Sequence, residues 1–431
     1  MLPLTALRWR HRRRRLYSVP TAFVLVALVL SWAMPAVDRA VDARLGSDDL
    51  AGFVFDSSTV AGTLSAIASG MIAFSGLVFT LLLLAVQFGT GQLSARLVPL
   101  LARDLVIRSA LGVFTATFVY ALLIAIRLGT RLQQYHLWLS SLLGIGLLLL
   151  STVLFFAMIT RMVDLLRVAR VCTRLGRRGI AYVPATHPHE YTPDREPVPG
   201  PDGPPTRVIR HRERPGVLVD LDVAAVARLA RRRGVRLSLT PAFGEFTRAD
   251  GVLFEVRGAA RVPARRLRAL VAFAEEHAIS GRHPSAMLRV LVDIALKALS
   301  PGINDPTTVT QALDEIEMLL LALAERELGP VTVCGRHGEP LLDYRLPDWA
   351  DYLSLATDEI RHYGTRSVQV LRRLRALYAE LIRHTPVRRH APVLARIAAL
   401  DDVVRREHSG PLESALASRP DRLGIGGPRR P

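Results

Sequence analysis

The stretch AGTLSAIASGMIAFSG, residues 61–76, decides the fold class of this 431-residue chain. It has no charged side chain and belongs to an apolar run that extends from residue 60 to residue 86. A helix of roughly 20 apolar residues is long enough to cross the hydrocarbon core of a bilayer. The stretch therefore predicts a transmembrane helix.

Three further apolar runs of similar length lie on either side of it, at residues 16–37, 105–126 and 137–160. None has an ionisable side chain in its central part, which argues against a transporter coupled to protons or ions. The first run follows a cluster of arginines, but its length and its Trp32 and Pro35 favour a retained anchor over a cleaved signal peptide. We predict four transmembrane helices within residues 1–160.

The distribution of arginine predicts the orientation of these helices. Six arginines precede the first run, Arg96 and Arg103 lie between the second and third with Arg108 in the first turn of the third, and six directly follow the fourth, whereas four lie in the loops on the other side. Positively charged flanks stay on the cytoplasmic side of a membrane. Both termini are therefore predicted to be cytoplasmic.

The second predicted helix has two alternative interpretations. Gly62, Ala66 and Gly70 recur at four-residue spacing, which permits close packing between helix backbones in lipid. Alternatively, polar side chains of this helix line a pore in a homo-oligomer. The candidate pore-lining residues are Ser69, Ser75, Thr80 and Gln87.

The rest of the chain predicts a cytoplasmic α+β domain that is mostly helical. Alternating apolar residues, a helical run at 223–233 and the turn dipeptide Asp250-Gly251 indicate a small α+β unit. Helical periodicity dominates afterwards. The predicted divisions are a helical extension and Pro-rich linker at 161–205, the α+β unit at 206–262, a helical domain at 263–408 and a disordered tail at 409–431.

The sequence ALSPGINDPTT, residues 298–308, predicts a tight turn between two helices. Pro301 ends the first helix, Gly302 permits a positive φ, and Asp305 caps the second helix. These roles alone account for the motif. A functional alternative is that the turn holds a carboxylate or phosphate at the start of the second helix. The candidate ligand-binding residues are Lys297, Ser300, Gly302, Asn304 and Asp305.

Composition narrows the partners that we expect. The chain has 56 basic and 38 acidic residues, for a net charge of +18, but its only lysine is Lys297. We attribute the arginine excess to a GC-rich codon bias and predict no nucleic-acid partner. Partners that remain are the lipid bilayer, an anionic ligand and further copies of the chain.

No metal, cofactor or catalytic site is predicted. Cys172 and Cys334 are far apart and form no CxxC motif. His187, His189 and Glu190 lie in a proline-rich segment and are expected to be solvent-exposed. The chain has no Gly-rich phosphate loop, nucleophile elbow or HExxH motif, so we do not expect an enzyme.

Three segments resemble one bacterial family. Residues 298–308, FSGLVFTL at 74–81 and LSARL at 93–97 are similar to the predicted membrane proteins grouped as domain-of-unknown-function family 2254. The resemblance covers nearly the whole chain. It implies a multi-pass protein of the bacterial plasma (inner) membrane with a cytoplasmic domain, and it implies no activity.

Two functions remain open at this point. The first is a membrane-anchored ligand-binding or scaffold module, whose cytoplasmic part senses an anion, a lipid head group or a protein near residues 300–306. The second is an oligomeric ion or solute channel, in which the second helix lines the pore and the cytoplasmic domains form the gate.

Overall fold

The computed structural model describes residues 4–49, 57–92, 104–130, 138–192, 200, 203–274 and 283–422. The chain separates into two compact units. The four-helix unit consists of the described residues of His11–Gly91 and Leu97–Arg167. The α+β unit consists of the described residues of Met1–Arg10, Gln92–Arg96 and Val168–Pro431.

All four predicted apolar runs lie on long helices. The helices are α1 (Leu4–Asp49), α2 (Ser57–Gln92), α4 (Leu105–Thr130) and α5 (Trp138–Leu166). Each contains a segment long and apolar enough to cross a membrane. The prediction of four apolar helices before a mostly helical domain is therefore confirmed.

The four-helix unit is held together by apolar packing around α4. Half of the apolar segment of α4 is buried within the unit, compared with 17% of the corresponding segment in each other helix. Tyr120 and Ile124 of α4 are fully buried, as is Leu64 of α2. Helices α1, α2 and α5 therefore keep most of their apolar surface exposed, as expected for helices surrounded by lipid.

One carboxylate is fully buried at an end of this unit, which the sequence did not lead us to expect. Asp38 of α1 accepts hydrogen bonds from the amides of Leu139 (2.9 Å) and Ser140 (3.2 Å) and from the Ser140 hydroxyl (2.5 Å). These amides belong to the first turn of α5, where the helix dipole favours a negative charge. Asp38 thus caps α5 from another helix, because α1 continues beyond the predicted end of the first run.

Two sheets organise the α+β unit. The larger has the strand order β1-β5-β3-β8-β7 and the smaller has β4-β2-β6. Among the described strands, only β3 and β8 pair in parallel, with Leu237 opposite Leu342. The strands are β1 (Arg207–Arg210), β2 (Gly216–Leu221), β3 (Arg236–Leu239), β4 (Phe246–Thr247), β5 (Val252–Arg257), β6 (Val271–Ala274), β7 (Val331–Cys334) and β8 (Pro340–Tyr344).

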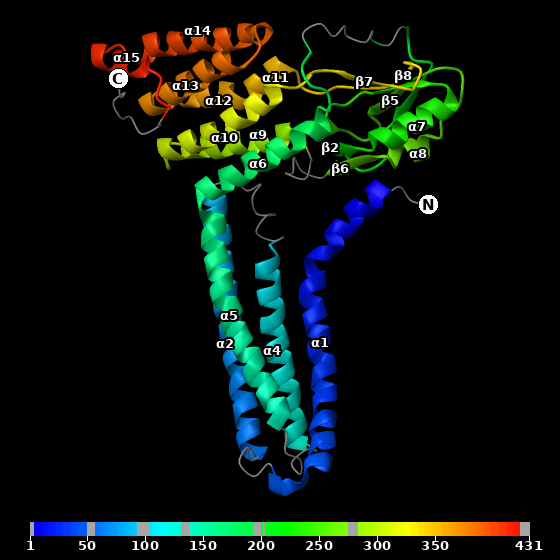
Figure 1. The fold of residues 1–431 in the computed structure, drawn as a ribbon, viewed down its shortest axis with the longest axis vertical. Coiled ribbons are helices and arrows are strands. Elements are labelled where there is room, and N and C mark those ends of the chain that lie inside the picture. The colour runs from blue at the N-terminus through cyan, green and yellow to red at the C-terminus, as the bar shows by residue number, and fades with distance from the viewer. Residues whose placement is uncertain are drawn as a thin grey trace. The chain divides into compact units, whose positions relative to one another are not determined.

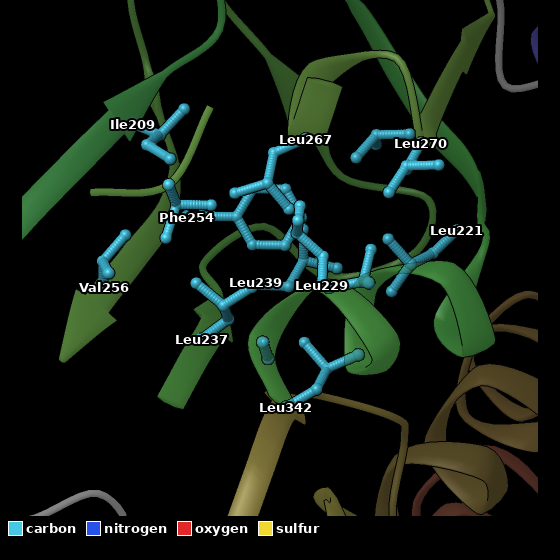
Figure 2. Packing of buried hydrophobic residues seen from close by; sticks show 14 of the residues in the cluster. Ile209, Leu221, Leu229, Leu237, Leu239, Phe254, Val256, Leu267, Leu270 and Leu342 are labelled. Carbon is cyan, nitrogen blue, oxygen red and sulfur yellow. The ribbon is translucent and has the colours of Figure 1, made fainter. Parts of the chain in front are cut away.

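One face of the larger sheet packs against α7 (Val223–Arg233) and α8 (Ala264–Arg268). Successive side chains of a strand point to opposite faces, so β3 buries Leu237 and Leu239 on this face. Figure 2 shows Phe254 of β5 directed into the same apolar core. Burial alternates along β3 as predicted, whereas β5 buries Leu253 in addition to Phe254 and Val256.

The helical part is built on the hairpin of α9 (Pro284–Ala298) and α10 (Pro306–Ala324). Helix α6 (Val168–Thr186) packs against both of them, and α13 (Val368–His384) packs against α10 (Figure 1). The remaining helical segments are α11 (Trp349–Leu353), the π-helix η2 (Ser354–Asp358), α12 (Glu359–Tyr363), the 3-10 helix η3 (Val387–Arg389), α14 (His390–Glu407) and α15 (Pro411–Ala417).

The structure differs from the predicted divisions in two places. Strands β6, β7 and β8 lie within residues 263–408, but β6 pairs with β2 and the other two belong to the same sheet as β3. The prediction of disorder from residue 409 is wrong up to Asp421, because residues 411–417 form α15 with Ala417 buried, and the amide of the buried Asp421 donates to the carbonyl of Arg372 (3.2 Å). Residues 423–431 lie outside the described part of the chain.

Candidate functional site

A groove of about 340 Å³ lies between α7 and the hairpin of β7 and β8. Three arginine side chains line it. The lining residues are Ala224, Ala227, Arg228, Arg231, Cys334, Gly335, Arg336 and Leu341. We call this feature the arginine groove.

Helix α7 supplies two of the arginines. Its start is fixed by Asp222, whose carboxylate accepts a hydrogen bond from the amide of Ala225 (3.0 Å), and its end by Gly234 at φ 61°. The face that contains Leu229 is buried against the sheet. Arg228 and Arg231 are three residues apart on the exposed side, so they share one face of the helix.

The third arginine comes from the turn of the hairpin. The amide of Gly335 donates to the carbonyl of Glu339 (2.8 Å), and Gly338 adopts φ 80°, which only glycine tolerates well. Hydrogen bonds from the backbone amides of Glu339 itself and His337 hold the pKa of the Glu339 carboxyl below its ordinary value. The turn thus presents Arg336 beside a fixed negative charge.

The positive charge of the three groove arginines is not balanced by direct ion pairs with described carboxylates. None of Arg228, Arg231 and Arg336 forms an ion pair within 4 Å of a carboxylate in the described part of the chain. A guanidinium group is a rigid fork of donors that matches carboxylate and phosphate oxygens. The groove is therefore suited chemically to a small anion.

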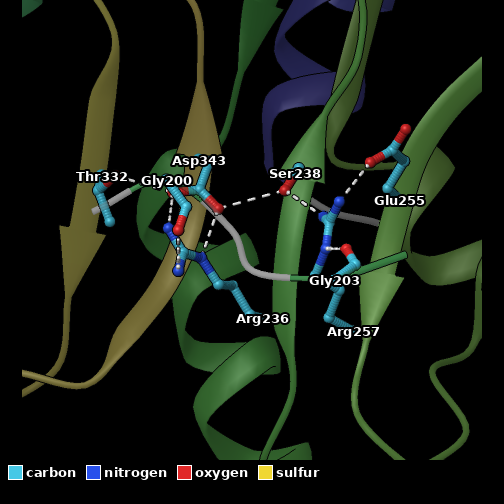
Figure 3. A network of polar contacts seen from close by, with 8 residues as sticks. All are labelled: Gly200, Gly203, Arg236, Ser238, Glu255, Arg257, Thr332 and Asp343. Atoms are coloured by element: carbon cyan, nitrogen blue, oxygen red, sulfur yellow. Dashed lines mark hydrogen bonds and ion pairs between the residues drawn. The ribbon is translucent and has the colours of Figure 1, made fainter. Parts of the chain in front are cut away.

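A polar network on the opposite face of the sheet joins the hairpin to β3, the strand that follows α7 (Figure 3). Arg236 of β3 forms two hydrogen bonds with Asp343 of β8, at 2.7 and 2.8 Å. Asp343 also accepts from the hydroxyls of Ser238 (3.2 Å) and Thr332 (2.8 Å). These bonds cross from β3 through β8 to β7, so they hold in place the strands on either side of Arg336.

The charge state of Asp343 depends on this network. Burial disfavours the ionised carboxylate, but the hydrogen bonds from Arg236 and Thr332 outweigh it and lower the pKa below its ordinary value. Asp343 is therefore ionised at neutral pH, as a two-point bond with a guanidinium requires.

The predicted turn site is ordered without any ligand. Asp305 accepts hydrogen bonds from the amide (3.1 Å) and hydroxyl (2.6 Å) of Thr308, so its own carboxylate occupies the start of α10. The Ser300 hydroxyl donates to the carbonyl of Lys297 (2.7 Å). The expectation of a positive φ at Gly302 is wrong, since Asn304 adopts it instead, at φ 45°.

The ammonium of Lys297 and the side chain of Asn304 are exposed near this turn. The structure therefore brings the five predicted residues together, but the geometry accounts for them as a helix cap and a turn. Their role in ligand binding stays a prediction.

The candidate pore-lining residues lie on the exposed part of α2. Ser69, Thr80 and Gln87 are exposed, and Ser75 is half-buried. The Thr80 hydroxyl donates to the carbonyl of Gly76 within its own helix (3.0 Å). A Cβ atom added at Gly62, Gly70 or Gly76 would have no other heavy atom of the described residues within 4 Å. No described helix of the same chain therefore packs closely against these small residues of α2, although one interpretation of the sequence predicts such packing.

Two histidines form a buried cluster that the sequence did not predict. The ring of His187 contacts the Tyr352 hydroxyl (2.9 Å) and the carbonyl of Glu327 (3.1 Å). Ser285 donates from its amide to Nδ1 of His283, which leaves a proton on Nε2 with no acceptor among the described residues. The expectation that His187 is solvent-exposed is wrong, because its amide continues the hydrogen-bonding pattern at the end of α6.

Burial determines the charge of both rings. It lowers the pKa of His187 to about 4 and that of His283 to about 3, with smaller contributions from Arg389 and from the neighbouring histidine, respectively. Both rings are therefore neutral at physiological pH. Within the described residues, no group of three or more His, Cys, Asp or Glu side chains could hold a metal ion.

The arginine groove could not have been recognised from the sequence. Arg231 and Arg336 are far apart in the chain and meet only because β3 pairs with β8. The local pattern of α7 gave the position of its two arginines on one face. Because we attributed the arginine excess to codon usage, we did not consider these two arginines as candidate binding residues.

Comparison with known proteins agrees with the architecture. An uncharacterised protein of Mycobacterium bovis is 29% identical over 369 residues, covering 82% of this chain and 70% of the relative. An uncharacterised protein of Mycobacterium tuberculosis matches with the same identity and coverage. No solved structure matches the chain. The family model described as "Predicted membrane protein (DUF2254)" matches residues 13–380, and the chain belongs to this family.

Proposed function

We propose that this protein is a membrane-anchored module that binds a small anionic ligand in the arginine groove on the cytoplasmic side of the bacterial plasma membrane. The single observation that carries the proposal is the convergence of Arg228, Arg231 and Arg336, without ion-pair partners among the described residues, on one groove. The proposed function is binding rather than catalysis.

Insertion into the membrane is supported by the four helices and by the family. Each helix has an apolar segment of at least 23 residues, which exceeds the roughly 20 needed to cross a bilayer. The excess of arginine on one side of these segments supports cytoplasmic termini. With this proposed orientation the α+β unit faces the cytoplasm.

The dimensions of the groove favour a small ligand. A volume of about 340 Å³ lies at the lower end of the roughly 300–1,000 Å³ typical of small-molecule sites. Three guanidinium groups favour a ligand with several anionic oxygens, such as a phosphate ester or a compound with two or three carboxylates. Inorganic pyrophosphate and citrate are suitable probes for these two classes.

The test is calorimetric titration of the full-length protein in detergent with pyrophosphate and with citrate. The double variant Arg228→Gln/Arg231→Gln removes two arginines from the groove. Arg232→Gln/Arg233→Gln is the matched control, because it removes the same charge from the same helix but not from the groove lining.

Each hydrogen bond to a charged group contributes about 1.5–3 kcal/mol, so we expect the groove variant to weaken binding at least about tenfold per arginine. The control should bind almost as the unmodified protein does. Equal affinity in all three proteins, or no binding of either probe to the unmodified protein, would refute the groove as an anion site.

The exposed face of α2 favours a second candidate function, an oligomeric channel. Small residues at Gly62, Gly70 and Gly76 are open in one copy of the chain, so a second copy can approach closely there. At 3.6 residues per turn, Ser69, Thr80 and Gln87 share the helix face of these glycines and would then lie near the contacts between copies, whereas Ser75 lies on the other side of α2.

The channel is tested by the mass of the protein in nanodiscs. We expect Gly70→Leu to dissociate an oligomer, whereas Gly146→Leu, at an equally open position of α5, should not. Gln87→Leu should change ion flux in liposomes. A monomer in nanodiscs would eliminate the channel and leave the anion-binding proposal unaffected.

A further inference from the structure

Helix α6 follows directly after the last apolar helix. Helix α5 ends at Leu166 and α6 begins at Val168, so Arg167 alone separates them. The apolar segment of α5 continues to Leu166. Two residues of chain extend at most about 7 Å, so the first turn of α6 must lie close to the end of that segment.

The two sides of α6 are chemically opposite. One side packs on α9 and α10 and is buried, through Val171, Cys172, Leu175, Gly176, Gly179 and Val183. Arg170, Arg174, Arg177 and Arg178 follow the spacing i, i+4, i+7 and i+8, which places them on one face at 3.6 residues per turn. We call these four arginines the α6 basic stripe.

Arg177 and Arg178 of the stripe carry positive charge that no described carboxylate pairs with. Helix α6 contains no Asp or Glu, and its residues Arg170, Arg177 and Arg178 are exposed. Neither Arg177 nor Arg178 forms an ion pair with a carboxylate among the described residues. The buried side of α6 is already occupied, so the stripe is the side available to a partner.

We propose that the α6 basic stripe binds the phosphate groups of anionic lipids at the cytoplasmic surface of the membrane. Because α6 begins directly after a membrane-crossing segment, the membrane surface is the partner within its reach. The positive charge of the arginines complements the negative charge of lipid phosphates. Basic clusters at such positions attract anionic lipids by about 1 kcal/mol per residue. The inference rests on the membrane insertion proposed above and is independent of the arginine groove.

The experiment compares the full-length protein in nanodiscs of phosphatidylcholine alone and in nanodiscs that also contain phosphatidylglycerol. Hydrogen exchange of residues 168–186 is measured as the phosphatidylglycerol content increases. We expect exchange in α6 to slow with anionic lipid, and about 1 M salt to abolish the effect, because the Debye length is then only ~3 Å.

The variant Arg177→Gln/Arg178→Gln should weaken this response. A loss of about 1 kcal/mol per arginine corresponds to a roughly fivefold weaker affinity for each one removed. The control is Arg265→Gln/Arg266→Gln, which removes two adjacent exposed arginines from α8 and should leave the response unchanged.

Two results would overturn the proposal. Identical exchange of α6 in both kinds of nanodisc would show that anionic lipid does not bind the stripe. If the α6 variant and the α8 control both lost the slowing of exchange to the same extent, the net charge of the protein rather than the stripe would attract the anionic lipid. A protein that does not remain in nanodiscs at all would instead contradict the membrane insertion on which the inference rests.

Discussion

Arg127 of α4 donates a hydrogen bond from Nη1 to the carbonyl oxygen of Ser31 in α1, at 2.7 Å. Pro35 lies four residues after Ser31 and has no backbone N–H, so this carbonyl lacks its usual helical partner. The arginine of one helix therefore satisfies a carbonyl that the proline of another leaves without a donor. A polar group in an apolar bundle needs such a partner.

This relationship predicts a coupling between Arg127 and Pro35. Arg127→Met should lower the melting temperature in detergent, because an unsatisfied buried carbonyl costs about 1–3 kcal/mol. In a Pro35→Ala background the amide of residue 35 can bond to the Ser31 carbonyl. The same arginine substitution should then cost less, and the difference measures the coupling in a double-mutant cycle. If Arg127→Met lowered the stability equally in the original protein and in Pro35→Ala, Arg127 would stabilise the unit through contacts other than the Ser31 carbonyl.

Asp38 predicts a second effect in the same unit. Asp38→Ala should destabilise the four-helix unit by about 1–2 kcal/mol, because the first turn of α5 loses its cap. Asp38→Asn keeps an acceptor for the Ser140 amide and should lose less. Thermal unfolding in detergent measures both variants, and an alanine variant as stable as the original protein would contradict the capping role.

The close approach at Gly179 predicts that a methyl group at this position of α6 displaces neighbouring side chains and costs stability. A Cβ at this position would lie 2.6 Å from Cδ2 of Leu319, well inside van der Waals contact. We expect Gly179→Ala to destabilise the α+β unit by about 1–3 kcal/mol. Gly302→Ala is the control, since its Cβ would meet nothing within 4 Å and its φ is not positive. Equal melting temperatures would contradict the close approach.

The buried histidines predict that acid destabilises the α+β unit. In the unfolded chain a histidine has a pKa near 6.5, whereas in the fold the pKa of His187 is about 4 and that of His283 about 3. The unfolded state therefore binds more protons below pH 6.5. The stability present above pH 6.5 is lost progressively as the pH falls toward 4 and then 3.

At pH 5 each histidine should have lost about 2 kcal/mol relative to pH 8. Urea unfolding in detergent at a series of pH values measures this slope. His187→Gln and His283→Gln should each flatten it, whatever their effect on stability at pH 8. An unchanged slope in both variants would show that other groups govern the acid sensitivity.

Much of the fold could be predicted because its determinants are local. The apolar length of residues 60–86 and the helical period of residues 223–233 each depend on neighbours in the chain. The structure has helices at both places, and α7 has the predicted bounds. Asp305 likewise caps α10 as its sequence position indicates.

The arginine groove depends on a contact that no local pattern encodes. The parallel pairing of Leu237 with Leu342 brings the hairpin to α7, and the alternation of β8 is equally compatible with other partners. The buried state of His187 has a similar origin, since Tyr352 and Glu327 reach it from distant segments. Asp38 was missed because the first helix continues past its apolar run.

The insertion of α9 and α10 between β3 and β8 also has a consequence for synthesis on the ribosome. About 100 residues separate the end of β3 from the start of β8, which corresponds to roughly 5–20 s of translation. During that interval the edge of β3 that later pairs with β8 has no partner, and an unpaired strand edge can recruit another nascent chain. The order of translation thus delays the parallel pairing of β3 with β8, and with it the arginine groove, until residues 340–344 have been synthesised.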